Sequence, residues 1–236
     1  MGADGPGGPA ARLGLTGEAA HPPIRSYGRI KARPVKPRQA ELVDAHLSEL
    51  IWRVGEDPRV PGRPVWLEIG FGGGEHLAEQ AARHPDVLLI GAEPFTNGVA
   101  SAVRHIVERG LQNVRVHPGD ARELLEALPT NVVDRAFILF PDPWPKARHH
   151  KRRLMTEPVI AELARVMRPG GALRFATDWK DYAAWTLERM ERSPDFRWTA
   201  ERAADWRLPP PDHVRTRYEA KGLGDSPPLF LEFDRR

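Results

Sequence analysis

The chain has 236 residues, of which 41% are hydrophobic and 28% are charged, and its net charge is +3. These values suit a soluble globular protein with one sizeable core and exclude a fibrous or a fully disordered chain. The absence of cysteine excludes disulfides, thiolate metal sites and cysteine nucleophiles, and no apolar stretch is long enough to span a membrane. We therefore expect a cytoplasmic protein.

Two segments precede the first strand that we predict. Residues 1–23 are rich in glycine, alanine and proline and are predicted to be a disordered leader. Residues 24–63 combine a basic arm, with six Lys or Arg residues and no acid up to residue 39, and a helix at residues 39–51. The arm is either a contact for a polyanion or a solvated linker. Residues 64–236 are predicted to form the main domain.

Strand and helix patterns alternate through this domain. Strands are predicted at residues 65–69, 87–92, 114–116, 135–140 and 171–176, and helices at residues 76–83, 96–109, 121–128 and 158–167. The last of these helices is expected to stop at the Arg-Pro-Gly-Gly sequence of residues 168–171, and residues 229–233 are expected to add an edge strand. The alternation predicts an α/β fold with an open, mostly parallel sheet that carries helices on both faces. Such sheets bind ligands beyond the carboxyl ends of their strands.

The first predicted strand ends in a glycine-rich turn. Glu68 precedes Gly70 and Gly72, where the backbone can bend and approach a ligand closely. A dinucleotide-binding fingerprint would need a further glycine at position 75, which is Glu75 in this chain. The turn therefore disfavours a dinucleotide, and a tight turn without a ligand is the alternative.

Two more carboxylates follow the next two strands. Glu93 lies about twenty residues after the glycines, where an acid can accept hydrogen bonds from both ribose hydroxyls. Asp120 can accept a hydrogen bond from an adenine amine, or it can cap the helix that follows it. Three carboxylates around one ligand favour a cationic molecule such as S-adenosylmethionine over a polyphosphate.

The fourth predicted strand runs into a proline-braced loop that contains Asp142 and Trp144. Five of the eight residues at positions 146–153 are Lys or Arg, and none of the eight is acidic. Such a stretch favours contact with nucleic-acid phosphates. The alternative is a structural loop beside a solvated basic segment.

These motifs resemble those of the bacterial tRNA (guanine-N7)-methyltransferase family. The resemblance rests on Leu-Glu-Ile-Gly-Phe-Gly-Gly-Gly at residues 67–74, Pro-Asp-Pro-Trp-Pro-Lys-Ala-Arg-His-His-Lys-Arg-Arg at residues 141–153, Ala-Thr-Asp-Trp at residues 176–179 and Thr-Arg-Tyr-Glu-Ala-Lys-Gly at residues 216–222. It covers roughly residues 25–235. It implies a Rossmann-like class I methyltransferase that transfers a methyl group from S-adenosylmethionine to N7 of guanine in tRNA, at position 46 of the variable loop.

The resemblance also implies roles for individual residues. Asp142 is the catalytic residue, and the cofactor contacts are Glu68, Gly70, Gly72, Glu93, Asp120 and Asp142. The substrate contacts are Lys146, Asp178, Thr216, Arg217, Tyr218 and Glu219, and the RNA contacts are Arg148, His149, His150, Lys151, Arg152 and Arg153. Without the resemblance, Asp178 is equally a helix N-cap, and Tyr218 and Glu219 are equally part of a surface loop.

The chemistry expected at N7 of guanine is simple. N7 has an in-plane lone pair and no proton, so its methylation needs positioning more than a strong base, and we expect no metal. Asp142 can stabilise the positive charge that develops on the base. S-adenosylhomocysteine would be the other product.

Three alternative functions stay open from the sequence. One is an amine or protein methyltransferase, since the fold does not choose the acceptor. The others are a non-catalytic RNA-binding subunit and an NAD-dependent oxidoreductase, which the glutamate at position 75 disfavours. The expected partner is tRNA and not a membrane, and both a monomer and a homodimer are compatible with the sequence.

Overall fold

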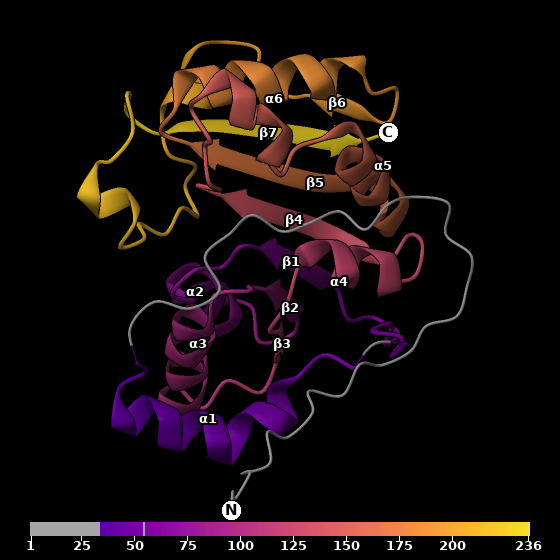
Figure 1. Cartoon of the computed structure of the whole chain (residues 1–236). Coiled ribbons are helices and arrows are strands. Elements are labelled where there is room, and N and C mark those ends of the chain that lie inside the picture. Colours follow the sequence, from indigo (N-terminus) through magenta and orange to yellow (C-terminus); the bar gives the residue numbers. More distant parts are fainter. Residues whose placement is uncertain (1–33, 54) are drawn as a thin grey trace, which may run out of the picture.

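A seven-stranded sheet forms the centre of the computed structural model, which describes residues 34–53 and 55–236 (Figure 1). The strands are β1 (Val65–Ile69), β2 (Leu88–Ala92), β3 (Val114–His117), β4 (Val133–Leu139), β5 (Met167–Thr177), β6 (Phe196–Trp198) and β7 (Leu229–Arg235). Their order is β3-β2-β1-β4-β5-β7-β6, and the first five are parallel to one another. The predicted α/β class is confirmed.

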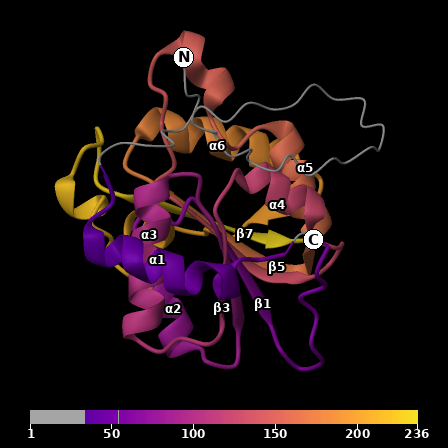
Figure 2. The same cartoon turned by 60° about the horizontal axis from the view of Figure 1, so that its bottom comes forward.

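Helices cover both faces of this sheet, and Figure 2 shows them as two groups on opposite sides. One group is α1 (Pro37–Leu50), α2 (Glu75–Arg83) and α3 (Thr96–Glu108); the other is α4 (Ala121–Ala127), α5 (Glu157–Val166) and α6 (Lys180–Arg192). Each group packs an apolar side onto the sheet and forms a separate core cluster with it. The central strands are therefore buried on both faces, which is why they appear in the sequence as continuous apolar runs. Short helical turns at Ala147–Arg152 (η1), Ala204–Arg207 (α7) and Glu219–Lys221 (η2) complete the described part of the chain.

Two sequence predictions about the sheet need correction. α5 stops at Val166, within one residue of its predicted end, but β5 begins directly with Met167 and not at residue 171, so the Pro-Gly pair lies inside the strand. The pairing of β4 with β5 shifts in register beside this pair, so the strand accommodates it as an irregularity. The last strand is also not at the edge: β7 lies antiparallel between β5 and the three-residue strand β6. A strand as short as β6 has no readable periodicity.

The N-terminal helix packs onto the same core. α1 lies against α3, and the Trp52 amide that follows it donates a hydrogen bond to the Val116 carbonyl at 2.8 Å. Trp52 itself is buried in the core. The predicted leader and most of the basic arm lie outside the described residues, and the division of the chain near residue 64 stays a prediction. In the part that is described, no helix has both the length and the apolar character needed to cross a membrane.

A long connection without regular strands links α7 to β7 and crosses the sheet face beside α2. We call residues 208–228 the crossing segment. Asp212 in this segment forms ion pairs with Arg135 of β4 and Arg174 of β5, each at 2.8 Å. Further along, the Tyr218 ring lies 5.7 Å from the ring of Phe140, which directly follows β4. In Figure 1 the crossing segment stands at the left, on the side toward which β1, β4 and β5 point.

Candidate active site

In the glycine turn after β1, the backbone adopts conformations that let other groups approach it closely. Gly70 and Gly72 have φ angles of 73° and 54°, which favour glycine over residues with a side chain. The Gly70 amide donates to the Ala92 carbonyl at 2.8 Å, and the Gly72 amide donates to the Glu93 carboxylate at 2.7 Å. On the other side, Gly98 of α3 lies so close to the Gly72 carbonyl that a β-carbon at position 98 would collide with it. The turn is therefore clamped between β2 and α3.

Two buried carboxylates lie near this turn, Glu68 in β1 and Glu93 directly after β2. Glu68 is 3% exposed and its carboxylate lies 2.8 Å from Nδ1 of His76, while Glu93 is 8% exposed and also accepts from the Phe95 amide at 2.9 Å. Burial raises the pKa of Glu93 above its ordinary value, against the lowering effect of the Phe95 and Gly72 amides. The negative charges of Asp142 and Glu68 raise it further. Glu68, Glu93 and Asp142 thus lie close enough for their negative charges to act on one another, which favours a cationic ligand.

Asp120 is the N-cap of α4, so this part of its predicted behaviour is confirmed. Its carboxylate accepts a hydrogen bond from the Arg122 amide at 3.0 Å, and it forms an ion pair with the Arg122 guanidinium, also at 3.0 Å. The cap places the carboxylate at the end of β3, next to the end of β2.

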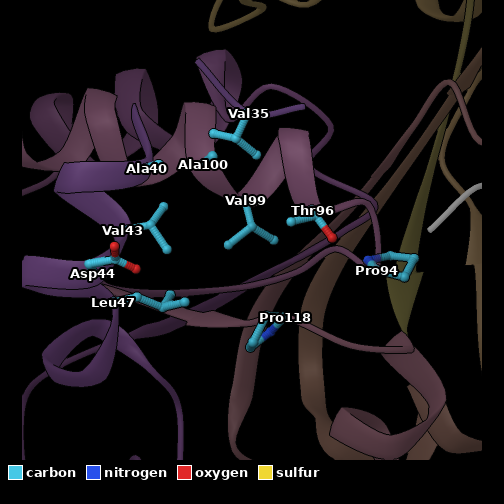
Figure 3. Close-up of a pocket in the computed structure, with 10 residues that line it drawn as sticks. All are labelled: Val35, Ala40, Val43, Asp44, Leu47, Pro94, Thr96, Val99, Ala100 and Pro118. Carbon is cyan, nitrogen blue, oxygen red and sulfur yellow. The ribbon is translucent and has the colours of Figure 1, made fainter. Parts of the chain in front are cut away.

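A pocket of about 180 Å³ opens beside these two strand ends, between α1 and α3 (Figure 3). Pro94, which follows Glu93, and Pro118, which precedes Asp120 by two residues, form its wall on the sheet side. The other lining residues come mainly from α1 and α3 and are Val35, Ala40, Val43, Asp44, Leu47, Thr96, Val99 and Ala100. The sequence carried no sign of this contribution by α1, because its lining side chains have only ordinary helical spacing.

The loop after β4 is strained where it carries Asp142. Phe140 and Trp144 have φ angles of 53° and 43°, and neither is glycine, so the backbone pays a conformational cost at both positions. The guanidinium of Arg152 lies 4.8 Å from the centre of the Trp144 ring, and His149 meets this ring edge-on at 5.9 Å. Strain of this kind is typical of functional sites. Asp142 itself is exposed, close enough to Glu93 for its charge to raise the pKa of that carboxyl.

The basic stretch splits into exposed and enclosed side chains. Lys146, Arg148 and Lys151 are exposed, whereas His149, His150 and Arg152 are half-buried. Partial desolvation lowers the pKa of His149, and the charges of Arg152, Arg148, Lys146 and Lys151 lower it further. The exposed members suit contact with phosphates.

Arg153 differs from the rest of the stretch because it is only 1% exposed. Its Nε donates to the Pro143 carbonyl at 2.9 Å, and its guanidinium pairs with Asp181 of α6 and packs over the rings of Tyr182 and Trp185. The sequence-based role of Arg153 as an RNA contact does not suit this position, because protein atoms enclose the charged group.

Asp178 and the crossing segment complete the same edge of the sheet. Asp178 follows β5 and is buried, and the N-cap alternative for it is wrong because Trp179 holds that position at α6. By strict geometry neither of its carboxylate oxygens has a hydrogen-bond partner within residues 34–53 and 55–236, but a hydrogen bond between Asp178 and the Tyr218 side chain contributes to the raised pKa of that tyrosine. Burial raises the pKa of Tyr218, and the charge of Asp178 adds to this rise, so the two side chains lie near one another.

The other predicted substrate residues point in different directions along the crossing segment. Arg217 forms an ion pair with Glu75 at the start of α2 and donates to the Ser101 hydroxyl of α3 at 3.2 Å. The Glu219 carboxylate lies 2.8 Å from Nε2 of His213, and the Glu219 amide donates to the Thr216 hydroxyl at 3.2 Å. Among the described residues, no group of three or more His, Asp or Glu side chains is arranged to hold a metal ion.

Comparisons with known proteins add to this geometry. Residues 62–229 match the model of a family described as "Putative methyltransferase". A tRNA (guanine-N(7)-)-methyltransferase of Caulobacter vibrioides (strain NA1000 / CB15N) is 58% identical over 224 residues, which cover 93% of this chain and 99% of that protein. The protein of the same name from Roseobacter denitrificans is 46% identical over 222 residues, which cover 89% and 95%.

Solved structures of methyltransferases share the fold. An rRNA methylase from Streptococcus thermophilus has a TM-score of 0.51 and 12% sequence identity, covering 86% of this chain and 99% of that chain. TrmN from Thermus thermophilus has a TM-score of 0.52 and 16% identity, covering 84% and 48%. At these identities the likeness concerns the fold alone, which is the Rossmann-like fold of class I methyltransferases.

Proposed function

Because the chain belongs to the tRNA (guanine-N(7)-)-methyltransferase family, we propose that it transfers a methyl group from S-adenosylmethionine to N7 of a guanine in tRNA. The product would be 7-methylguanosine. One structural observation carries the proposal: the charges of Asp142, in the strained loop, and of the buried Glu68 both act on the buried Glu93, and an exposed basic stretch continues from that loop. The most specific part of the proposal is the target base, the variable-loop guanine at position 46 of tRNA, and the resemblance of the motifs supports it.

The residues at the carboxyl edge fit S-adenosylmethionine. Each oxygen of Glu93 accepts one backbone hydrogen bond and keeps a further lone pair, so the carboxylate can also accept from ribose hydroxyls. A β-carbon at Gly70 or Gly72 would meet no atom within 4 Å apart from its chain neighbours, so a ligand can approach the backbone there, and the joint negative charge suits a cation. When bound, the cofactor would supply a methyl group on a positively charged sulfur. The residues that would hold it are Glu68, Gly70, Gly72, Glu93, Asp120 and Asp142.

Asp142 is the proposed catalytic residue. Guanine N7 needs no base to attack, so the carboxylate would act by holding the guanine edge and by stabilising the positive charge that methylation creates. Asp178 would support it from the end of β5, because its buried carboxylate can accept from the hydrogens on N1 and N2 of guanine. The remaining proposed substrate contacts are Lys146, Thr216, Arg217, Tyr218 and Glu219.

The tRNA backbone is proposed to bind along the exposed part of the basic stretch. Arg148 and Lys151 would neutralise phosphates directly, and the half-buried His149, His150 and Arg152 would line the same surface. Arg153 is left out of this set because it is enclosed. A cytoplasmic location belongs to the proposal, since that is where tRNA is available.

The test is a methylation assay with methyl-labelled S-adenosylmethionine and unmodified tRNA, followed by nucleoside digestion and mass spectrometry. We expect labelled 7-methylguanosine from the wild type, and a single-turnover rate about 100-fold lower for Asp142→Asn, which keeps the size but removes the charge. Asp86→Asn, a surface variant between α2 and β2, is the matched control and should retain the wild-type rate.

The other outcomes identify the competing functions. Label in another nucleoside or in a protein acceptor would refute N7 methylation of guanine. Binding of S-adenosylhomocysteine without any turnover would indicate a non-catalytic RNA-binding subunit. An unchanged rate in Asp142→Asn would remove Asp142 from its proposed role and leave the rest of the site in place.

A further inference from the structure

A row of buried polar side chains on α2 connects the cofactor edge to the crossing segment. His76 and Gln80 lie one helical turn apart and are 1% and 0% exposed. Nδ1 of His76 lies 2.8 Å from the Glu68 carboxylate, and Nε2 of His76 lies 3.3 Å from the Gln80 amide nitrogen. The same amide nitrogen donates to the Asp212 carbonyl at 3.1 Å. Three hydrogen bonds thus join the end of β1 to residue 212.

Simple valence rules decide the direction of each hydrogen bond in this row. The Asp212 carbonyl can only accept, so the nitrogen of the Gln80 amide must face it. That nitrogen also faces Nε2 of His76, which must therefore be an acceptor without a proton. The histidine proton is left on Nδ1, where it is donated to Glu68. The orientation of the Glu68 carboxylate and that of the Asp212 backbone are set by one connected arrangement.

Burying polar side chains on a helix face that packs against a sheet lowers the stability of the fold wherever a polar atom lacks a hydrogen bond. The Gln80 side-chain oxygen is buried and makes no hydrogen bond within the part of the chain that the structure describes. A half-satisfied buried amide destabilises the folded protein relative to an apolar residue of the same size. The two donor hydrogens of Gln80 account for the presence of an amide at this position.

Residue 212 is also the point at which the crossing segment is fastened to the sheet. The Asp212 carboxylate pairs with Arg135 and Arg174, and its backbone carbonyl accepts from the buried Gln80 and, at 3.3 Å, from the more exposed Arg83. Four residues later the segment reaches the proposed substrate contacts, Thr216 to Glu219. A shift of the backbone at Asp212 would therefore be passed on to them through a short piece of chain.

We propose that His76 and Gln80 are positioning residues that link Glu68 to the crossing segment, so that occupation of the cofactor site restrains the substrate contacts at residues 216–219. The roles of Glu68 and of these contacts rest on the proposed function, whereas the hydrogen-bonded link does not. Such coupling is reciprocal: whatever orders the crossing segment must also favour the arrangement of Glu68 that binds the cofactor.

The first measurement uses the ligand-free protein and hydrogen exchange detected by mass spectrometry. Replacing Gln80 by Met keeps the length of the side chain and its helix propensity but removes both donors. We expect peptides that contain the amides of His213 and Glu219 to exchange several-fold faster in Gln80→Met than in the wild type. Asn113→Ala is the matched control, because the Asn113 amide is also buried and donates to the Ala81, His84 and Val87 carbonyls around the other end of α2.

The control should lose stability without a selective effect on residues 212–219. Equal exchange of these residues in Gln80→Met and the wild type would overturn the proposal, as would the same change in Asn113→Ala.

The second measurement adds saturating S-adenosylhomocysteine to each protein. We expect it to slow exchange in residues 212–219 of the wild type, and to bind Gln80→Met without slowing exchange there. Slowing of the same size in both proteins would refute the link. Failure of the wild type to bind S-adenosylhomocysteine would count against the proposed function instead, and the comparison of the ligand-free proteins would still decide whether the link exists.

Discussion

The position of Glu93 in the site changes the ionisation of its carboxyl group. The Glu93 carboxylate is buried after the end of β2. This burial raises its pKa above the ordinary 4.5, although hydrogen bonds from two backbone amides act in the opposite direction. The neighbouring negative charges of Asp142 and Glu68 act in the same direction as burial. A bound cation would relieve this repulsion, which is a physical reason for a positively charged ligand to bind here.

The raised pKa makes cofactor binding sensitive to mild acid. As the pH falls, Glu93 takes up its proton at a higher pH than an ordinary glutamate does, and the neutral acid is a weaker acceptor for ribose hydroxyls. We expect the affinity for S-adenosylhomocysteine, measured by calorimetry from about pH 8 to about pH 5, to begin to fall above the ordinary glutamate range. Glu93→Gln should bind more weakly and without this dependence. A wild-type affinity that is constant over the whole interval would contradict the assignment of Glu93.

At the scale of elements, Arg153 joins the loop of Asp142 to α6. Its guanidinium donates to the Pro143 carbonyl, one residue beyond Asp142, and pairs with Asp181 in the first turn of α6. The Leu154 amide that follows donates to the Tyr182 hydroxyl at 3.1 Å. A strained loop needs such support, because nothing in its own sequence favours the left-handed conformations at Phe140 and Trp144.

Replacing Arg153 by Met should therefore affect stability and turnover. We expect a loss of about 2 kcal/mol in the free energy of unfolding, mostly from the charged hydrogen bond to the Pro143 carbonyl, since the Asp181 side chain is 63% exposed and its ion pair is screened. Urea denaturation measures this loss. The methylation rate should fall with little change in tRNA affinity.

Arg148→Met, in the exposed part of the same stretch, is the comparison for Arg153. It should weaken tRNA binding and leave the free energy of unfolding unchanged. If Arg153→Met instead weakened tRNA binding at full stability, Arg153 would be an RNA contact after all.

At the scale of the whole molecule, the net charge of +3 is too small to bind RNA by itself, so the distribution of charge decides. The exposed cations at residues 146–151 lie directly beside the carboxyl edge of the sheet, where the carboxylates collect. A cluster of carboxylates that suits a cation and a positive surface that suits phosphates are thus adjacent on one edge, which matches a reaction between a cationic cofactor and a nucleic acid.

This arrangement predicts a salt-dependent affinity for tRNA. Each phosphate contact contributes about 0.7 to 0.9 to the slope of the logarithm of affinity against the logarithm of salt concentration. We expect Lys151→Gln to lower the magnitude of the wild-type slope by about 1. Arg197→Gln, on the edge strand β6 away from the basic stretch, should leave it unchanged. An affinity that does not change with salt would exclude the phosphate-binding role of the stretch.

The amino-acid sequence by itself determined the features that depend on neighbouring residues. The strands β1 to β3 and the helices α2 to α4 lie within two residues of their predicted bounds, because apolar runs, helical spacing and glycine turns are local signals. For the same reason the glycine turn, the Asp120 cap and the position of Asp142 after β4 could be identified in advance.

The tertiary structure alone decided which distant residues meet. It placed β7 inside the sheet, buried Arg153 beneath the Asp142 loop, brought α1 to the pocket and laid Asp212 across β4, β5 and α2. Nothing in the spacing of His76 and Gln80 indicates Asp212, which lies more than 130 residues away in the chain. Contacts of this kind are set by how whole elements pack against one another, and that packing depends on the complete core.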